Sequence, residues 1–205
     1  PYFVGAGTGA ADLITVRGMR LLEQADVIIY AGSLVNPELL GYAKKECEIF
    51  NSATMTLSEV LAVMQQSQEA EKMLVRLHTG DPSIYGAIRE QMDELDRLGI
   101  PYESCPGVSA CFGAAASLNI EYTLPGISQS LIITRMEGKT KVPTKESIES
   151  FAAHQASMAI YLSTVQRYAS SSFHVALYTS AAGVFFSYPP AISLWLNSSN
   201  MPVLK

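Results

Sequence analysis

The chain has 205 residues, of which 48% are hydrophobic and 16% charged, and its 19 acidic and 14 basic residues give a formal net charge of −5. This length suits one large or two small domains with a real apolar core, which excludes a disordered chain and a disulfide-stapled mini-protein. The acidic excess argues against nucleic-acid binding. No secretion signal is recognised at the N-terminus and no apolar run reaches the ~20 residues of a membrane span, so we expect a cytoplasmic protein without a membrane partner.

The three cysteines, Cys47, Cys105 and Cys111, form no CxxC pair and have no histidine at ligand spacing. Neither a structural metal nor a disulfide framework is indicated, and we expect buried free thiols.

Short β-branched runs alternate with amphipathic helical patterns over the first two thirds of the chain, which is typical of β/α units around a mainly parallel sheet. Strands are predicted at residues 2–5, 27–30, 73–79, 102–105, 130–135 and 157–162. Helices are predicted at residues 13–24, from 36 onward, and at 56–71, 84–98, 109–118 and 145–153.

Local signals support several of these helices. Asn36 suits an N-cap with Pro37 at the first helical position, and Thr56 with Glu59 fits a capping box. Gly99 is expected to end the helix at residues 84–98.

A domain boundary is expected between Leu118 and Gln129, which gives an N-terminal domain of residues 1–120 and a C-terminal domain of residues 121–205. The α/β pattern is lost after about residue 166. Residues 168–204 contain no Asp, Glu, Lys or Arg. We therefore expect the second domain to be atypical or incomplete in its C-terminal part, with a tail that is poorly packed.

The segment VGAGTGAADLIT (residues 4–15) places Gly5, Gly7 and Gly9 between a strand and a helix. A nicotinamide dehydrogenase is one hypothesis, but the spacing is G-x-G-x-G, and no acidic residue ends the second strand to bind a ribose. A tight turn that needs positive φ angles explains the glycines equally well.

The segment RLHTGDPSIYG (residues 76–86) runs from a central strand into a loop, at the edge where α/β sheets bind ligands. The carboxylate of Asp81 is either a ligand contact or the N-cap of the following helix, and the residues alone leave both open. His78 lies inside the strand and is interpreted as a core residue with its hydrogen bonds satisfied, in preference to a catalytic base.

These two segments, with PGVSA at residues 106–110, resemble the motif set of the tetrapyrrole methylases, which use S-adenosylmethionine in cobalamin and sirohaem synthesis. The resemblance continues through residues 121–123, 128–143 and 157–163, where it is specific to the members that methylate C-11 of precorrin-4 or cobalt-precorrin-4. It implies a two-domain α/β fold, a homodimer, a methyl donor bound between the domains, and a tetrapyrrole substrate in an adjoining trough.

The resemblance also implies which residues contact S-adenosylmethionine, with S-adenosylhomocysteine as the product. The matching positions are Thr8, Thr79, Gly80, Asp81, Ile84, Ser109, Ala110 and Leu162. Thr8 replaces a proline of the family's first loop and Ala10 replaces its usual aspartate, so this loop departs from the family pattern.

Methyl transfer from a sulfonium needs two reactants held in line and water kept out, more than it needs strong acid–base groups. Glu90 matches an acidic position implicated in related methylases, and Arg89 lies beside it in the helix predicted after the donor loop. We expect these two residues to be the catalytic pair, without a metal.

A macrocycle with many carboxylates requires local cations on an acidic protein. The candidates are Arg17, Arg76, Arg89, Arg135, Lys139 and Lys141, each of which is alternatively a solvated surface charge. We select Arg135, at the end of a predicted strand, and Arg17 as substrate-binding residues.

Two alternatives to a C-11 methyltransferase stay open. One is a tetrapyrrole methylase that acts on another ring carbon. The other is a non-catalytic relative that binds a tetrapyrrole and has lost turnover through its altered first loop and unmatched C-terminal segment.

Overall fold

The computed structural model describes residues 1–138, 140–161, 168–170, 173–175, 184–185 and 195–196, the last four ranges by their backbone alone. The chain divides into two compact units, Pro1–Ser109 and Ala110–Lys205. The domain boundary expected near residue 120 stays a prediction, and the tail expected to be poorly packed lies largely outside the described residues.

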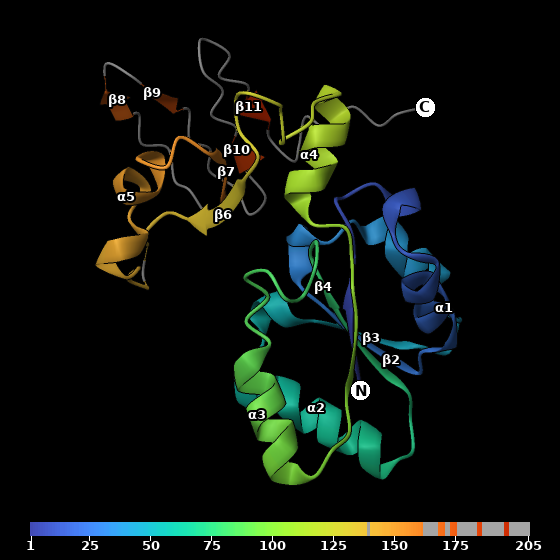
Figure 1. Ribbon diagram of the computed structural model, residues 1–205. Helices are drawn as coiled ribbons and strands as arrows, with labels where there is room; N and C mark the ends of the chain where they lie inside the picture. The colour runs from blue at the N-terminus through green and yellow to red at the C-terminus, as the bar shows by residue number, and fades with distance from the viewer. Residues whose placement is uncertain (139, 162–167, 171–172, 176–183, 186–194, 197–205) are drawn as a thin grey trace. The chain divides into compact units, whose positions relative to one another are not determined.

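The first unit is built on one five-stranded sheet in which every pairing is parallel (Figure 1). Its strand order is β3-β2-β4-β1-β5. The strands are β1 (Tyr2–Gly5), β2 (Val27–Tyr30), β3 (Glu48–Asn51), β4 (Leu74–His78) and β5 (Glu103–Cys105). The α/β class with a mainly parallel sheet in the first part of the chain is therefore confirmed.

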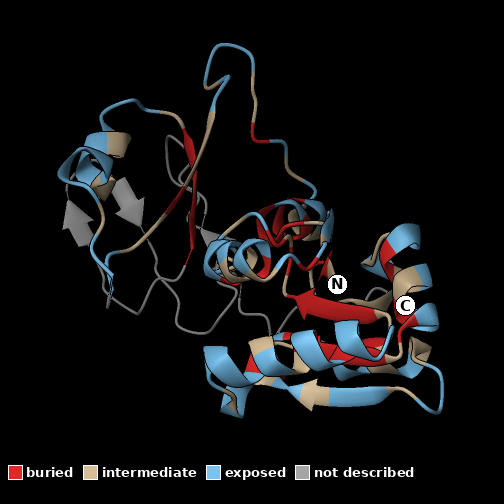
Figure 2. Ribbon diagram, turned by 90° about the horizontal axis from the view of Figure 1, so that it is seen from below, coloured by how far each residue is buried: buried red, intermediate tan, exposed pale blue. Residues whose placement is uncertain are grey.

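Alternate residues of each central strand face opposite sides of the sheet, and both sides are covered by helices. Val4, Ile28 and Val75 belong to one buried apolar cluster, which α1 (Val16–Gln24) joins through Leu22. Phe3, Ile29 and Leu74 belong to the other cluster, which α2 (Leu57–Glu69) and α3 (Arg89–Leu98) cover. Figure 2 shows the buried strands between helices whose outer surfaces are exposed.

Two helix starts in the first unit differ from the prediction. The helix expected from residue 13 begins at Val16, because the Thr15 hydroxyl accepts a hydrogen bond from the Gly18 amide and caps it there. The helix expected from residue 84 begins at Arg89, because Tyr85 and Ala87 both have positive φ angles that no right-handed helix accommodates. The end of α3 at Gly99, which has φ of 68°, is as predicted.

Other local predictions are confirmed. The Thr56–Glu59 capping box is present at the start of α2. The Asn36 side chain caps the segment Pro37–Tyr42, which is a 3-10 helix. Strand β3 at the sheet edge was not predicted from the sequence, because its side chains are half-exposed or exposed and carry no clear apolar alternation.

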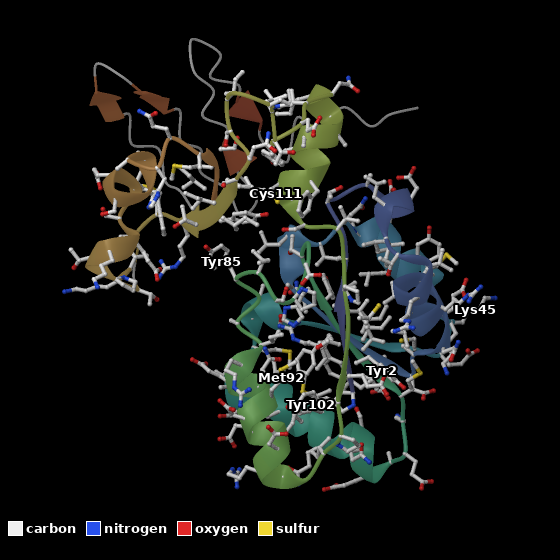
Figure 3. The ribbon with its side chains drawn as sticks, viewed as in Figure 1. Tyr2, Lys45, Tyr85, Met92, Tyr102 and Cys111 are labelled. Atoms are coloured by element: carbon white, nitrogen blue, oxygen red, sulfur yellow. The ribbon has the colours of Figure 1, made fainter. Side chains whose placement is uncertain are left out.

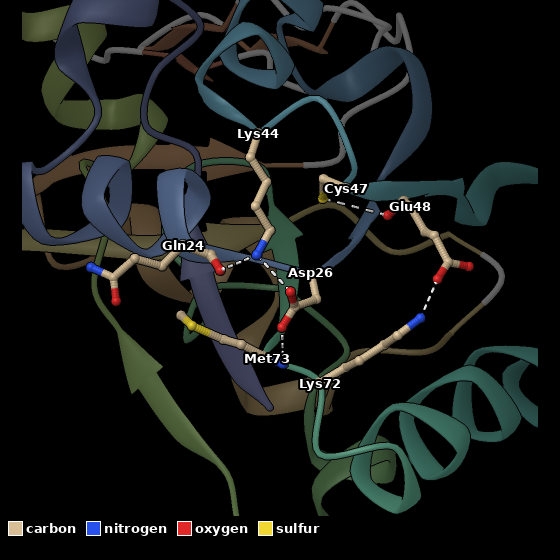
Figure 4. A network of polar contacts seen from close by, with 7 residues as sticks. All are labelled: Gln24, Asp26, Lys44, Cys47, Glu48, Lys72 and Met73. Atoms are coloured by element: carbon tan, nitrogen blue, oxygen red, sulfur yellow. Dashed lines mark hydrogen bonds and ion pairs between the residues drawn. The ribbon is translucent and has the colours of Figure 1, made fainter.

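The amino-terminal edge of the sheet carries two exposed ion pairs (Figure 4). The Asp26 carboxylate lies 2.5 Å from Lys44 Nζ and also accepts a hydrogen bond from the Met73 amide. Lys72 pairs with Glu48 at 2.5 Å. The pKa of Asp26 is lowered by the hydrogen bonds from Lys44 and Met73.

The second unit contains α4 (Ala110–Leu118), β6 (Leu131–Arg135), α5 (Ile148–Ala152) and β7 (Ser157–Tyr161). Strands β6 and β7 pair in parallel, as expected of an α/β unit. Further short strands are β8 (Tyr168–Ser170), β9 (Phe173–Val175), β10 (Val184–Phe185) and β11 (Trp195–Leu196), which form two antiparallel pairs. None of the described helices has the length and apolar character needed to cross a membrane.

Candidate functional site

The topology of the first unit defines one switch point, between the neighbouring strands β1 and β4. The chain leaves β1 toward α1 on one face of the sheet and leaves β4 toward α3 on the other. Open α/β sheets bind ligands at the carboxyl ends of such strands, where the two connections diverge. The two segments singled out from the sequence are the loops that leave this point.

Glycines allow the backbones of three loops to touch here. A Cβ atom on Gly5 would lie 2.5 Å from the Gly107 Cα and 2.5 Å from the Gly80 oxygen, and one on Gly107 would lie 2.1 Å from that oxygen. These distances exclude any side chain at Gly5 or Gly107. The residue type is therefore dictated by close backbone approach, whereas at Gly7, with φ of 79°, it is also dictated by the turn.

Hydrogen bonds then tie the loops to one another. Gly7 and Gly80 exchange amide–carbonyl bonds of 3.2 and 2.9 Å. The Asn36 side chain donates to the Gly9 carbonyl at 2.7 Å, and the Thr79 hydroxyl donates to the Leu34 carbonyl at 3.1 Å. The loops after β1, β2 and β4 thus form one connected rim.

Asp81 extends this rim to the loop after β5. Its Oδ2 accepts the Gly107 amide at 2.9 Å, and its Oδ1 accepts both the amide and the hydroxyl of Ser83, at 2.8 and 2.5 Å. Since α3 begins eight residues later, Asp81 is not its N-cap, and that alternative is excluded.

The protonation state of Asp81 follows from these bonds. Burial alone raises the pKa of its carboxyl, but the hydrogen bonds from Ser83 and Gly107 outweigh it and hold the pKa below its ordinary value. The side chain is therefore a carboxylate at neutral pH.

A pocket of about 190 Å³ opens beside this carboxylate. It is lined by Asp81, Pro82, Ser83, Ile88, Ser104, Cys105 and Pro106. The described residues that line it include one carboxylate and neither lysine nor arginine, so the lining carries negative charge beside the apolar Pro82, Ile88 and Pro106. Its volume is below the ~300–1,000 Å³ of a complete small-molecule site.

The segment between β4 and α3 is held in an irregular conformation, with Tyr85 at its exposed centre (Figure 3). Gly86 packs on the Pro82 carbonyl so closely that a Cβ would lie 2.1 Å from its oxygen. The Gln91 side chain donates to the Ala87 carbonyl at 3.0 Å and accepts from the guanidinium of Arg76.

Arg76 was considered as a surface cation for the substrate, and that is wrong. It is 7% exposed, and its guanidinium donates to the Ile29 carbonyl and to Gln91. Burial lowers its pKa to about 10. Its role is to join β4, β2 and α3 within the core.

His78 is buried, as predicted, but it is not satisfied: its Nε2 has no hydrogen-bond partner within the described part of the chain. Burial, with a contribution from the charge of Arg76, lowers its pKa to about 3. The ring is neutral at physiological pH and packs near Phe3, so it does not act as a proton acceptor in the pocket.

The remaining predicted residues fall into separate places. Thr8 and Ile84 are half-buried in their loops, and Ser109 is buried directly before Ala110, the first residue of α4. Leu162 lies outside the described residues. Arg17 on α1 is exposed, as are Glu90 and Arg89 in the first turn of α3, where Arg89 pairs with Asp93.

Arg135 ends β6, as predicted, and its guanidinium is occupied by its own loop. It donates to the carbonyls of Met136, Thr140 and Lys141, each at 3.1 Å. These bonds fix Met136, Thr140 and Lys141 around the guanidinium, while a substrate contact by Arg135 stays a prediction.

Sequence reasoning missed the partners of Asp81. Gly107 was noted only within the motif PGVSA, and Ser83 only within the segment RLHTGDPSIYG. Their spacing in the chain carries no sign of mutual contact, because β4 and β5 are separated in the sheet by β1.

The geometry also weakens the dehydrogenase hypothesis. Dinucleotide-binding loops pass straight into a helix whose N-terminus faces the pyrophosphate. Here a 3-10 turn at Ala11–Leu13 intervenes, and α1 begins only at Val16.

Comparison with known proteins identifies the family of the chain. The sequence model of the tetrapyrrole (corrin/porphyrin) methylases matches residues 2–177. The chain belongs to this family.

Three similar proteins show which members of the family the chain resembles. The cobalt-precorrin-4 C(11)-methyltransferase of Methanocaldococcus jannaschii is 58% identical over 159 residues, which cover 78% of this chain and 61% of that protein. The X-ray structure of a cobalt-precorrin-4 methyltransferase of cobalamin biosynthesis superposes with a TM-score of 0.76 at 46% identity, over 78% of this chain and 67% of that one. The uroporphyrin-III C-methyltransferase of Thermus thermophilus, complexed with S-adenosylhomocysteine, has a TM-score of 0.62 at 26% identity, over 78% and 64%.

The curated relatives include both cobalt-precorrin-4 and precorrin-4 C(11)-methyltransferases. The matches to these C(11)-methyltransferases cover 61% to 66% of their length.

Proposed function

We propose that the protein transfers the methyl group of S-adenosylmethionine to C-11 of precorrin-4 or cobalt-precorrin-4 in cobalamin synthesis. The observation that carries the proposal is the Asp81-centred rim at the switch point between β1 and β4. The 58% identity to a cobalt-precorrin-4 C(11)-methyltransferase supports the choice of substrate and ring carbon over another tetrapyrrole methylase.

The residues of the rim fit the donor. Asp81 is ionised and its carboxylate retains acceptor capacity beyond its three present bonds, since two oxygens offer about four lone-pair sites. Gly5, Gly80 and Gly107 keep side chains away from the switch point. When bound, S-adenosylmethionine supplies an electrophilic methyl group carried on a sulfonium.

The chain's own contribution is to bind and orient. We propose that Thr8, Thr79, Gly80, Asp81, Ile84, Ser109, Ala110 and Leu162 contact the donor. The bonded rim holds its members in one geometry before a ligand arrives, which is the preorganisation that an in-line transfer requires.

Further residues complete the proposal. Glu90 and Arg89 are proposed to steer the ring proton that leaves after methylation, and Arg135 and Arg17 to bind substrate carboxylates. We also propose that the protein is cytoplasmic and that it forms a homodimer. Sedimentation velocity would test the homodimer.

Calorimetric titration with S-adenosylhomocysteine tests donor binding. Asp81→Asn is expected to raise the Kd about 10- to 100-fold, the effect of losing one charge-assisted hydrogen bond. The matched control is Asp96→Asn, which changes an exposed carboxylate of α3 and should leave the Kd unchanged.

A folded parent protein that fails to bind S-adenosylhomocysteine contradicts the proposal. A tetrapyrrole binder without turnover is then favoured. If the donor binds, transfer of a labelled methyl group to cobalt-precorrin-4 and to metal-free precorrin-4 identifies the substrate.

A further inference from the structure

Strand β7 reaches the first turn of α4 through one hydroxyl group. Tyr161, the last residue of β7, is 8% exposed, and its Oη accepts a hydrogen bond of 3.1 Å from the Cys111 amide. Cys111 is the second residue of α4, so its amide is among the first four that have no carbonyl partner within the helix. Tyr161 therefore satisfies a helix-start amide from fifty residues away in the sequence.

A second tyrosine bonds the backbone carbonyl of Cys111. The Tyr122 hydroxyl donates to the Cys111 carbonyl at 2.6 Å, and the Tyr122 carbonyl in turn accepts from the Ser157 hydroxyl at 2.7 Å. Burial raises the pKa of Tyr122, so its phenol stays a neutral donor. Both bonds hold α4 within the second unit. Of the two, only the bond to Tyr161 uses an amide of the first turn, which has no carbonyl partner within the helix.

The residues next to Cys111 and Tyr161 in the chain relate this contact to the proposed donor site. Ala110 directly precedes Cys111, and Leu162 directly follows Tyr161. Both are proposed donor contacts, although they lie in segments far apart in the chain. The Tyr161 hydroxyl thus sets the first turn of α4 relative to the end of β7.

We infer that Tyr161 is a positioning residue for methyl-donor binding, acting through the first turn of α4. The inference rests on the proposed function, because it assumes that Ala110, at the start of α4, meets the donor. The hydroxyl takes no part in the transfer itself. Removal of the hydroxyl should therefore lower the affinity for the donor and leave the rate of the chemical step nearly unchanged.

The test compares Tyr161→Phe with Tyr122→Phe. Each removes one buried hydroxyl that bonds the backbone of Cys111, so both should lower thermal stability. Only Tyr161→Phe is expected to raise the Kd for S-adenosylhomocysteine and the KM for S-adenosylmethionine, by about 10-fold. The kcat at saturating donor and the KM for the tetrapyrrole should stay within about twofold of the parent values.

The outcomes separate this inference from the proposed function. A parent protein that does not bind S-adenosylhomocysteine overturns both. A parent that binds, with Tyr161→Phe binding equally well or both variants weakened equally, overturns the role of Tyr161 alone.

Hydrogen exchange decides the case in which Tyr161→Phe does not fold. In the parent protein, S-adenosylhomocysteine is expected to slow exchange of the Ala110 and Cys111 amides. Unchanged exchange at both amides on saturation with ligand overturns the inference.

Discussion

The two edges of the five-stranded sheet are held together by different kinds of interaction. At the carboxyl edge, loops after four strands are joined by backbone hydrogen bonds and by buried or half-buried side chains, with glycines where backbones touch. At the amino edge, exposed lysines and carboxylates pair across the starts of the strands (Figure 4).

The difference shows which edge has a demanding geometry. A surface ion pair tolerates movement of either partner and contributes little, because water and salt screen it. A backbone contact that leaves no space for a Cβ excludes every side chain, so both the residue type and the approach of the loops are constrained. The more constrained geometry is therefore at the carboxyl edge.

The largest expected effect is that of Gly107→Ala at the carboxyl edge. The new Cβ would lie 2.1 Å from the Gly80 oxygen, and both partners are backbone, so the loops must separate. We expect a loss of about 3 kcal/mol of unfolding free energy in urea titrations, and loss of S-adenosylhomocysteine binding.

Gly41→Ala is the control for that substitution. A Cβ on Gly41 meets nothing within 4 Å, so the unfolding free energy should change by less than about 0.5 kcal/mol. Equal effects of the two substitutions would show that the carboxyl edge is not the rigid one.

The next effect is the acid response of His78, at the end of β4. Its folded pKa of about 3 lies below its ordinary 6.5, so protons bind to the unfolded chain first and stability falls as pH falls from 6.5 toward 3. Between pH 7 and pH 5 the loss is about 2 kcal/mol.

His78→Leu should remove this loss. It deletes a buried nitrogen, Nε2, that has no hydrogen-bond partner in the part of the chain that the structure describes, so stability at pH 7 should be equal or higher. The exposed His154 offers a control, since His154→Gln should keep the parent's dependence on pH. Urea unfolding at pH 7 and pH 5 measures the pH dependence of both variants. If His78→Leu loses as much unfolding free energy between these pH values as the parent, His78 is not the source of the loss.

The smallest effect is expected at the amino edge. Asp26→Asn removes an exposed pair with Lys44 and weakens the bond to the Met73 amide. The melting temperature should fall slightly at low salt and approach the parent value in 1 M NaCl, with donor affinity unchanged. Because the folded pKa of Asp26 is lowered, its contribution is present at neutral pH and lost on acidification below its ordinary range. A weakened donor affinity would break the distinction between the edges.

Local signals in the sequence predicted much of the fold. The capping box of Thr56 and Glu59 and the stop at Gly99 were identified from neighbouring residues, because their interactions span a few positions. The start of α3 was not, since the positive φ angles of Tyr85 and Ala87 depend on Gly86 packing against Pro82 and on a bond from Gln91.

The candidate site divides in the same way. Asp81 was singled out from its place after a buried strand, and its family from the motif around it. Whether it capped a helix or joined loops was open until the structure placed its carboxylate on Gly107. Arg76 was weighed as a substrate cation from its charge, although it lies in the same central strand, and the structure buries its guanidinium on the Ile29 carbonyl and Gln91.

By itself, the sequence determined the alternation of strands and helices, the family, and the segments that meet at the ligand edge, because each depends on residue type and local order. Only the tertiary structure decided that Gly5, Gly80 and Gly107 touch, that the Nε2 of His78 has no hydrogen-bond partner among the described residues, and that Tyr161 bonds the start of α4. These contacts join residues up to about a hundred positions apart, and strand order, which no local pattern encodes, brings the glycines together.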